Sequence, residues 1–323
     1  MINKNPEQCI HCHKCTEHCD FLNKYKMDIG DVEKLKAHAF NCFLCGTCSQ
    51  VCPVGIDGKE VILGMRQQIA SEDSRIIEKQ NKGLLWEKND YKFKNYRHAK
   101  GNSALFPGCN FPSLYPKTTK KIAEIFREQY GIGIVYDCCG KPVSELGLLE
   151  KEKALIDNLE KRLSEQNIKE LILFCPNCYG FFKDKLSVSL VPIYEKIEQL
   201  GIGKANLNKD GKIFLPCSDR YEREWYEQIL KFSDGKLSPI EGVQCCGLGG
   251  CASGKEPEIV QGLAETIRLQ TDGVLYTYCA SCSGQLTRQD LKSVKHVLPE
   301  IFETSEKPEV KKSFINRAVN KFR

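Results

Sequence analysis

One cysteine pattern occurs twice in this chain, and the repetition constrains the fold more than any other feature. A single cysteine, an adjacent Cys-Cys-Gly and a Cys-x-x-Cys pair run from Cys109 to Cys178 and again from Cys217 to Cys282. Corresponding cysteines of the two copies are 104 to 108 residues apart. A repeat of this length indicates two copies of one structural unit, each large enough to bury its own core.

Short apolar runs precede the cysteine groups, and helical patterns separate them. The runs lie at residues 104–106, 132–136, 171–174, 213–215 and 274–278. They are typical of buried strands. Apolar residues at helical spacing lie near 122–126, 155–163, 221–232 and 258–270. The alternation predicts α/β layers with a largely parallel sheet. Loops that follow parallel strands meet at one edge of a sheet, so the cysteines are expected to gather there.

The eight cysteines of the first block form two Cys-x-x-Cys-x-x-Cys-x-x-x-Cys motifs. Three cysteines at this spacing wrap one corner of a cubic iron–sulfur cluster, and the fourth crosses to a neighbouring cluster. We therefore assign one cubane 4Fe-4S cluster to Cys9, Cys12, Cys15 and Cys52, and another to Cys42, Cys45, Cys48 and Cys19. Zinc ribbons are the alternative, but they would leave extra cysteines beside each tetrahedral metal.

This block resembles the helical type of two-cluster ferredoxin domain, with an insert at residues 20–41. We expect one helix after Asp31 and another from Asp57, with its apolar residues on one face. Asp20 stands where that family usually has proline. Three histidines lie among the cysteines, at His11, His13 and His18. With four cysteines for each cluster, we interpret them as exposed or second-sphere residues; direct ligation is the alternative.

Each repeat holds five cysteines, one more than a cube needs, and two of them are adjacent. Adjacent side chains diverge, so both reach one centre only if that centre is large or open, which favours an unusual polynuclear cluster. The glycine after each pair, Gly140 or Gly247, permits a tight turn. Cys251, within the second repeat, is left over after the eight ferredoxin cysteines and the five cysteines of each repeat are assigned. It is interpreted as a free buried thiol, or alternatively as a pocket thiol that forms a mixed disulfide with substrate.

The sequences FPGC, CCGKP, CPNC, CCGLGG and CASC resemble the cysteine-rich CCG domains of heterodisulfide reductase. Two such domains behind a two-cluster ferredoxin are similar in layout to the catalytic subunit of the membrane-linked enzyme, and to iron–sulfur subunits of related sulfite-reductase complexes and glycolate or glycerol-3-phosphate dehydrogenases. The resemblance covers roughly residues 1 to 302. It implies a non-cubane 4Fe-4S cluster in each repeat. The implied catalytic ligands are Cys109, Cys138, Cys139, Cys175 and Cys178, then Cys217, Cys245, Cys246, Cys279 and Cys282.

The resemblance also implies an activity, in which a disulfide is reduced between the two non-cubane clusters by electrons relayed through the cubanes. Both motifs are intact, which favours an enzyme. The alternative is a non-catalytic electron-transfer subunit of a dehydrogenase or respiratory complex. The single cysteine and the Cys-Cys pair are separated by 28 residues in the first copy and 27 in the second. These short loops leave the identity of the disulfide open.

The expected fold class is α/β, with a helical two-cluster ferredoxin domain followed by two Rossmann-like CCG units related by a pseudo-twofold axis. The predicted boundaries are 1–80 for the ferredoxin-type domain, 81–103 for a linker, 104–203 and 204–302 for the CCG units, and 303–323 for a basic tail.

Electrons are expected from a separate donor, which would be a flavoprotein, a ferredoxin or a membrane cytochrome subunit. No Gly-x-Gly-x-x-Gly follows a predicted strand outside the cysteine loops, so no flavin or NAD site is predicted. His296 is predicted on a helix after the last cysteine pair, in a packed second-sphere role or, alternatively, as a proton donor. The expected substrate is a small disulfide or thiol.

The formal net charge is +5, but two cubanes with their thiolates would lower it to about +1, so nucleic acid is not an expected partner.

The N-terminal MINKNPEQC has no apolar signal region, and a cytoplasmic, reducing location is expected, with membrane association through a partner. Residues 310–323 form a basic amphipathic pattern. That segment is expected either to contact a membrane or redox partner, or to pack on its own domain.

Overall fold

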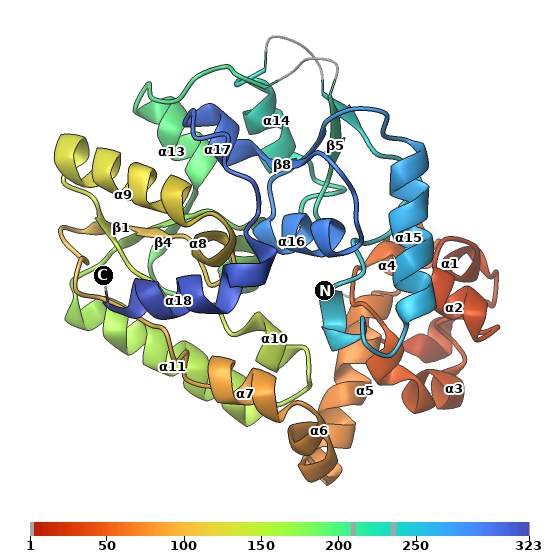
Figure 1. The fold of residues 1–323 in the computed structure, drawn as a ribbon. Coiled ribbons are helices and arrows are strands. Elements are labelled where there is room, and N and C mark those ends of the chain that lie inside the picture. Colours follow the sequence, from red (N-terminus) through yellow and green to blue (C-terminus); the bar gives the residue numbers. More distant parts are fainter. Residues whose placement is uncertain (1–2, 208–210, 234–236, 323) are drawn as a thin grey trace. The chain divides into compact units, whose positions relative to one another are not determined.

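The computed structural model describes residues 3–207, 211–233 and 237–322 (Figure 1). The chain divides into two compact units. Unit 1 comprises Met1–Asn89, Lys141–Glu152 and Gly242–Thr266, and unit 2 comprises Asp90–Gly140, Lys153–Glu241 and Ile267–Arg323. The segments that follow the two Cys-Cys-Gly motifs therefore join unit 1 rather than the remainder of their own repeats. The predicted domains were consecutive segments of the chain, and their boundaries stay a prediction.

Unit 1 is helical. Its helices are α1 (Lys14–Glu17), α2 (Asp20–Lys24), α3 (Val32–Ala37), α4 (Thr47–Val51), α5 (Gly58–Glu72), α6 (Arg75–Gln80), α7 (Lys82–Lys88), α10 (Lys141–Ser144) and most of α15 (Pro257–Leu269). The Asp57 side chain accepts a hydrogen bond from the Glu60 amide and caps α5, as expected for an aspartate before a helix. The predicted helices after Asp31 and Asp57 are confirmed. The predicted linker, by contrast, begins as helix α7.

Unit 2 contains two sheets with the same topology. The first has strand order β2-β1-β3-β4 and the second β6-β5-β7-β8, with every pair parallel. The strands are β1 (Ser103–Phe106), β2 (Gly133–Ile134), β3 (Glu170–Leu173), β4 (Ser189–Pro192), β5 (Lys212–Phe214), β6 (Ser238–Pro239), β7 (Leu275–Thr277) and β8 (Val294–His296). The repeated parallel α/β unit is confirmed. Strands β4, β6 and β8 were not predicted, since they are short and each contains a proline or a lysine.

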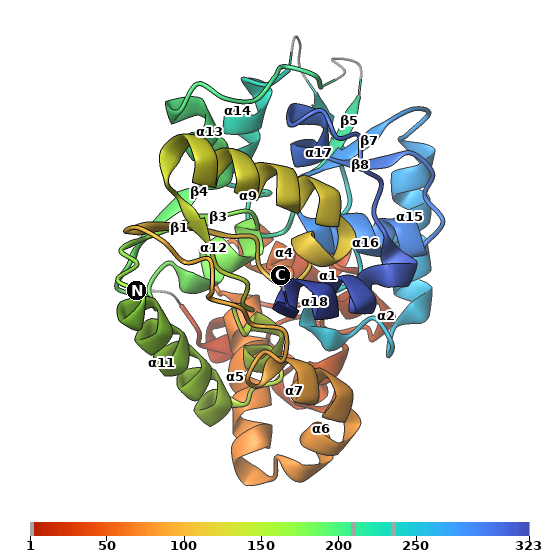
Figure 2. The ribbon, with the colours of Figure 1, turned by 60° about the vertical axis from the view of Figure 1, so that its left-hand side comes forward.

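Helices connect these parallel strands, because a parallel pair cannot be joined by a tight turn. They are α8 (Phe111–Leu114), α9 (Pro116–Tyr130), α11 (Leu149–Glu165), α12 (Pro176–Phe182), α13 (Ile193–Gln199), α14 (Glu224–Leu230), α16 (Ala280–Arg288) and α17 (Val297–Ile301), followed by the C-terminal α18 (Ser313–Phe322) (Figure 2). The core packs strands such as β1 and β3 against Phe126 of α9 and Phe182 of α12. Helices α12 and α16 each begin directly after the first cysteine of a Cys-x-x-Cys pair. The sheets thus carry the cysteine pairs at strand ends, as the sequence predicted.

Candidate metal centres

The ferredoxin-type cysteines lie together in unit 1. Cys19 is within electrostatic range of Cys45 and Cys42 although it belongs to the first motif, and Cys48 lies near Cys42, Cys19 and Cys45. Cys15 lies near Cys9 in the same way. This grouping agrees with a fourth cysteine that crosses between the two motifs. The assignment of individual ligands stays a prediction.

Backbone amides in this region point at the thiols. Leu44 N–H donates to Cys42 Sγ over 3.3 Å, Ile56 N–H to Cys52 Sγ over 3.3 Å and His11 N–H to Cys9 Sγ over 3.4 Å. Both Leu44 and His11 have positive φ, which turns their amides inward. N–H groups of this kind stabilise charged sulfur, so the loops fit thiolate ligands of a cluster.

Burial makes the charged form of these thiols unfavourable unless a cation is bound nearby. It raises the pKa of Cys42 to about 12, and it raises the pKa values of Cys19 and Cys48 well above their ordinary value. Buried thiolates are costly unless a cation compensates their charge, and iron supplies that charge when it is bound. The donor set and its burial therefore fit an iron–sulfur cluster.

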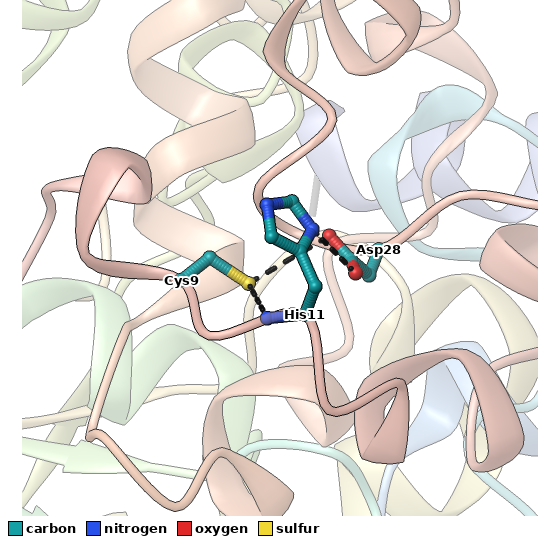
Figure 3. Close-up of side chains that lie close together, drawn as sticks. All are labelled: Cys9, His11 and Asp28. Atoms are coloured by element: carbon teal, nitrogen blue, oxygen red, sulfur yellow. Dashed lines mark hydrogen bonds and ion pairs between the residues drawn. The ribbon is translucent and has the colours of Figure 1, made fainter.

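Asp28 is a fully buried carboxylate beside the first motif that the sequence analysis did not single out (Figure 3). Its Oδ2 lies 3.0 Å from His11 Nδ1 and 3.3 Å from His13 Nδ1, and its Oδ1 accepts from the Gly30 amide over 2.8 Å. Cys9 Sγ lies 3.7 Å from Oδ1. Both histidines are thus held by a carboxylate in positions beside a cysteine, which suits a second-sphere role. His18 instead contacts the Lys14 carbonyl at 2.9 Å.

Arg66 is the second residue that sequence analysis missed. It is fully buried on α5, and its guanidinium donates to the carbonyls of Ala39, Cys42, Glu145 and Gly250 over 2.6 to 2.9 Å. Ala39 and Cys42 lie just before and at the start of the second ferredoxin motif, and Glu145 and Gly250 lie in the segments that follow the two Cys-Cys-Gly motifs. One side chain therefore holds three segments of the sequence together within unit 1.

All five thiols of the first repeat, and three of the five in the second, lie in unit 2. Cys138 Sγ lies 3.6 Å from Cys109 Sγ. Hydrogen-bonding contacts then join further thiols in series, namely Cys139 with Cys178, Cys178 with Cys175, Cys175 with Cys279 and Cys279 with Cys282. The contact between Cys175 and Cys279 links the first repeat to the second. Hydrogen bonds from Cys175 and Cys282 hold the pKa of Cys279 well below its ordinary value.

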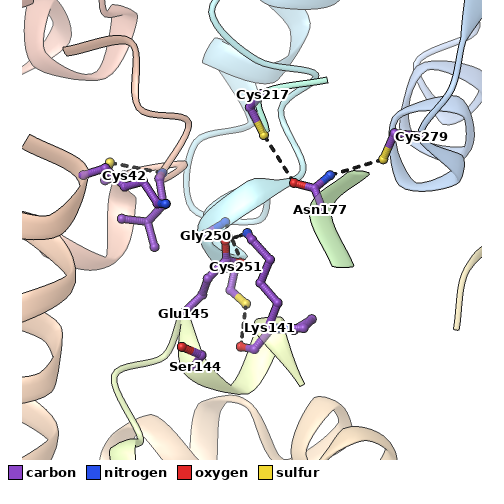
Figure 4. A network of polar contacts seen from close by, with 12 residues as sticks. Cys42, Lys141, Ser144, Glu145, Asn177, Cys217, Gly250, Cys251 and Cys279 are labelled. Atoms are coloured by element: carbon purple, nitrogen blue, oxygen red, sulfur yellow. Dashed lines mark hydrogen bonds and ion pairs between the residues drawn. The ribbon is translucent and has the colours of Figure 1, made fainter. Parts of the chain in front are cut away.

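Asn177 strengthens the link between the repeats (Figure 4). It lies within the Cys-x-x-Cys pair of the first repeat, but its Nδ2 donates to Cys279 Sγ over 3.3 Å and its Oδ1 lies 3.7 Å from Cys217 Sγ, both in the second repeat. A reciprocal contact runs the other way, from Asn110 Nδ2 to Ser281 Oγ over 2.7 Å. Cys245 and Cys246 of the second repeat are buried in unit 1, where the Gly247 amide donates to Cys245 Sγ over 3.2 Å.

His296 ends strand β8, so its predicted position on a helix is wrong; its ring instead caps α17. Its Nδ1 accepts from the Leu298 amide over 3.2 Å, which leaves the ring proton on Nε2. Nε2 is buried and has no hydrogen-bond partner among the described residues. Burial lowers the pKa of His296 to about 3, so the ring is neutral near pH 7, which favours the packed role over proton donation. The ring lies beside the Tyr278 backbone and in electrostatic range of Cys279, so a sulfur acceptor of a bound cluster would be close to it.

Cys251 is half-buried and borders a cavity of about 380 Å³ in unit 1, together with α6 residues and Phe40. Its backbone has a φ of 55°, and its Sγ lies 3.8 Å from the Pro142 carbonyl (Figure 4). Burial, assisted by the Glu145 charge, raises its pKa to about 11. At neutral pH it is a protonated and weakly nucleophilic thiol.

Comparison with known proteins finds two kinds of domain in the chain. The 4Fe-4S dicluster domain matches residues 8–56, and the cysteine-rich CCG domain matches residues 103–183 and 212–287. The chain is similar to an uncharacterised iron–sulfur protein of Methanococcus maripaludis, with 23% identity over 299 residues that cover 81% of this chain and 60% of the relative. A second uncharacterised iron–sulfur protein, from Methanocaldococcus jannaschii, is 22% identical over 343 residues, covering 91% of this chain and 70% of that protein. The chain thus spans only about 60% of the length of the first relative.

Among solved structures, glutamate racemase RacE1 of Bacillus anthracis aligns over 62% of this chain and 78% of its own, with 12% identity and a TM-score of 0.32. A score this low does not establish a shared fold. The domain matches and the cysteine geometry lead to one identification. This chain is an iron–sulfur protein with an N-terminal 4Fe-4S dicluster domain followed by two cysteine-rich CCG domains, as in heterodisulfide reductase subunits.

Proposed function

We propose that this iron–sulfur protein reduces a small disulfide, or a related thiol substrate, with electrons from a separate donor protein. The observation that carries the proposal is the contact between Cys175 and Cys279, which joins the thiols of two complete CCG motifs. Reduction of a disulfide consumes two electrons and two protons. Two one-electron centres beside each other suit that demand.

The proposed cofactors are two cubane clusters in the ferredoxin motifs and two non-cubane 4Fe-4S clusters, each held by the five cysteines of one repeat. When bound, such clusters accept and release single electrons. The chain's own residues then set the geometry. Asn177 contacts thiols of the other repeat through both ends of its amide, which fixes their spacing. The buried N–H of His296 is available to a sulfur near Cys279.

Exposure differs among the thiols of unit 2 in a way that supports a substrate route. Cys109, Cys175 and Cys217 are half-buried. The remaining five are buried, and they are Cys138, Cys139, Cys178, Cys279 and Cys282. A substrate sulfur would reach the half-buried thiols, which belong to both repeats, more easily than the buried ones.

The test uses anaerobically prepared protein with its full iron content. We expect small thiols added to the oxidised protein to produce a new EPR signal, and the reduced protein to be reoxidised by a disulfide such as cystine or glutathione disulfide. Cys246→Ser should abolish the thiol-dependent signal, while Cys251→Ser should keep it. If no thiol or disulfide changes the signals of the wild-type protein, while a redox partner still exchanges electrons with it, the protein is an electron-transfer subunit instead.

A further inference from the structure

The C-terminal helix α18 packs on unit 2 through its polar side. Asn316 donates to the Ser113 carbonyl over 2.9 Å, and Asn320, which is buried, donates to the Pro112 carbonyl over 3.3 Å. The carbonyl of Asn320 also accepts from Asn95 Nδ2 over 2.9 Å. Helix α8, which carries Pro112 and Ser113, follows Cys109 in the sequence. The helix is therefore anchored to its own domain by asparagines.

Four large apolar residues of α18 are exposed to a large extent. The exposed fractions are 54% for Phe314, 60% for Ile315, 42% for Val319 and 72% for Phe322. At 100° of rotation per residue, these four positions span an arc of about 140° on one side of the helix. A surface helix normally buries such a stripe, whereas most of this one is exposed. One edge of the stripe rests on unit 2, because Phe314 contacts Phe93 with ring centroids 5.4 Å apart and Ala318 packs on the same cluster. Ile315, Val319 and Phe322 form the exposed remainder.

The surroundings of this apolar face are basic. Residues 310–322 contain Lys311, Lys312, Arg317 and Lys321 and no acidic residue. Lys311, Lys312 and Lys321 are exposed. Arg317 also lies in electrostatic range of Arg288 on α16, where burial and the charge of Arg317 together lower the pKa of Arg288. An anionic surface would attract the three exposed lysines, Lys311, Lys312 and Lys321.

We propose that α18 is an in-plane membrane anchor that lays its Phe314, Ile315, Val319 and Phe322 face on an anionic lipid surface, with the flanking lysines on the headgroups. An amphipathic helix with bulky apolar residues on one side and lysine or arginine at its edges has the composition of an interfacial helix. No described helix of the chain is long and apolar enough to cross a membrane. Contact through this face is therefore peripheral.

Geometry favours a lipid surface over a protein partner. The apolar side chains project from one convex helix of ten residues. A protein partner would have to supply a matching groove, whereas headgroups and acyl chains adapt to the helix. The same reasoning disfavours a second copy of the chain, because two helices that present these faces would bring like charges together.

The test is co-sedimentation of the full chain, with its clusters, with vesicles. Phosphatidylcholine vesicles are compared with vesicles of equal parts phosphatidylcholine and phosphatidylglycerol. We expect binding to the anionic vesicles only, weakened by salt. Ile315→Ser with Phe322→Ser should reduce the bound fraction by about tenfold or more, since both side chains lose their apolar contact. Lys311→Gln with Lys312→Gln should weaken binding by about fivefold for each lysine at low salt.

The matched control is Leu269→Ser, because Leu269 is an apolar residue of unit 2 that is 80% exposed at the end of α15, outside the basic face. It should bind as the wild type does. Iron content and circular dichroism establish that each variant is folded. Lys311 and Lys312 precede α18, so their replacement does not change the helix itself. Wild-type protein that stays in the supernatant with anionic vesicles would overturn the proposal. So would a dimer in light scattering that the Ile315→Ser, Phe322→Ser variant abolishes, since the face would then belong to a second copy.

Discussion

Arg66 shows what a single residue contributes to unit 1. It follows Met65 on α5, and its guanidinium hydrogen-bonds to four buried carbonyls rather than to a carboxylate. Guanidinium donors are fixed in a plane, so one arginine can satisfy several carbonyls whose positions are fixed. Burial lowers the pKa of Arg66, while the nearby Cys42 and Glu145 act in the opposite direction. A permanent cation beside the second ferredoxin motif also offsets the negative charge of thiolates there.

Replacement of Arg66 by methionine should destabilise unit 1 strongly. Each buried carbonyl that loses its donor costs about 1–3 kcal/mol, and four lose it together. We expect a lower midpoint in denaturant unfolding and loss of iron from the ferredoxin motifs under conditions in which the wild type retains it. Arg75→Met is the matched control, because Arg75 is exposed and, among the described residues, its side chain pairs only with Asp73. An Arg66→Met protein as stable as the control would contradict this role.

Two glycines let the segments after the Cys-Cys-Gly motifs approach the ferredoxin helices closely. Gly147 has a φ of 81°, and a Cβ there would lie 2.5 Å from the Arg66 backbone carbon. Gly250 has a φ of 62°, and a Cβ there would overlap the Cys42 carbonyl oxygen. The turn conformation and the lack of a side chain are both required at these positions. These elements are therefore joined at backbone contact distance.

Gly250→Ala should separate the segment at 249–251 from the second ferredoxin motif. The left-handed conformation costs an alanine about 1–2 kcal/mol before any overlap is counted, so the loss of stability should exceed that range. The matched control is Gly64→Ala in α5, where an added Cβ meets nothing within 4 Å. That change should stabilise the helix by about 0.5–1 kcal/mol. Thermal unfolding of the two variants measures both effects, and equal melting temperatures would show that the close approach is unimportant.

For the whole molecule, the cysteine inventory predicts the metal content. Eighteen of the 19 cysteines are assigned to four clusters, which predicts about 16 iron atoms and as many acid-labile sulfides per chain. Removal of iron should leave several buried thiols without a compensating cation and expand the protein. Iron and sulfide analysis of anaerobically purified protein checks the number, and Cys251→Ser should not change it. Stoichiometric zinc in place of iron would contradict the cluster assignment.

Much of the architecture could be predicted from local patterns. The two cysteine repeats, the parallel strands β1, β3, β5 and β7, and the helices after Asp31 and Asp57 each depend on residues close together in sequence. Strand β8 was missed because three residues that include a lysine carry little periodic signal, and this is why His296 was assigned to a helix. Asp28 and Arg66 were missed because an isolated charged residue in a helical or loop pattern is usually exposed.

The sequence by itself determined the kind of chemistry, since cysteine spacing sets which thiols can reach one metal centre, and the repeat length set two α/β units. Only the tertiary structure decided that the segments after both Cys-Cys-Gly motifs join the ferredoxin helices, that Cys175 meets Cys279, and that α18 leaves most of its apolar stripe exposed. The reason is physical. Arg66 binds backbone carbonyls, and every residue has one. The amino-acid types at the accepting positions therefore do not reveal these long-range contacts.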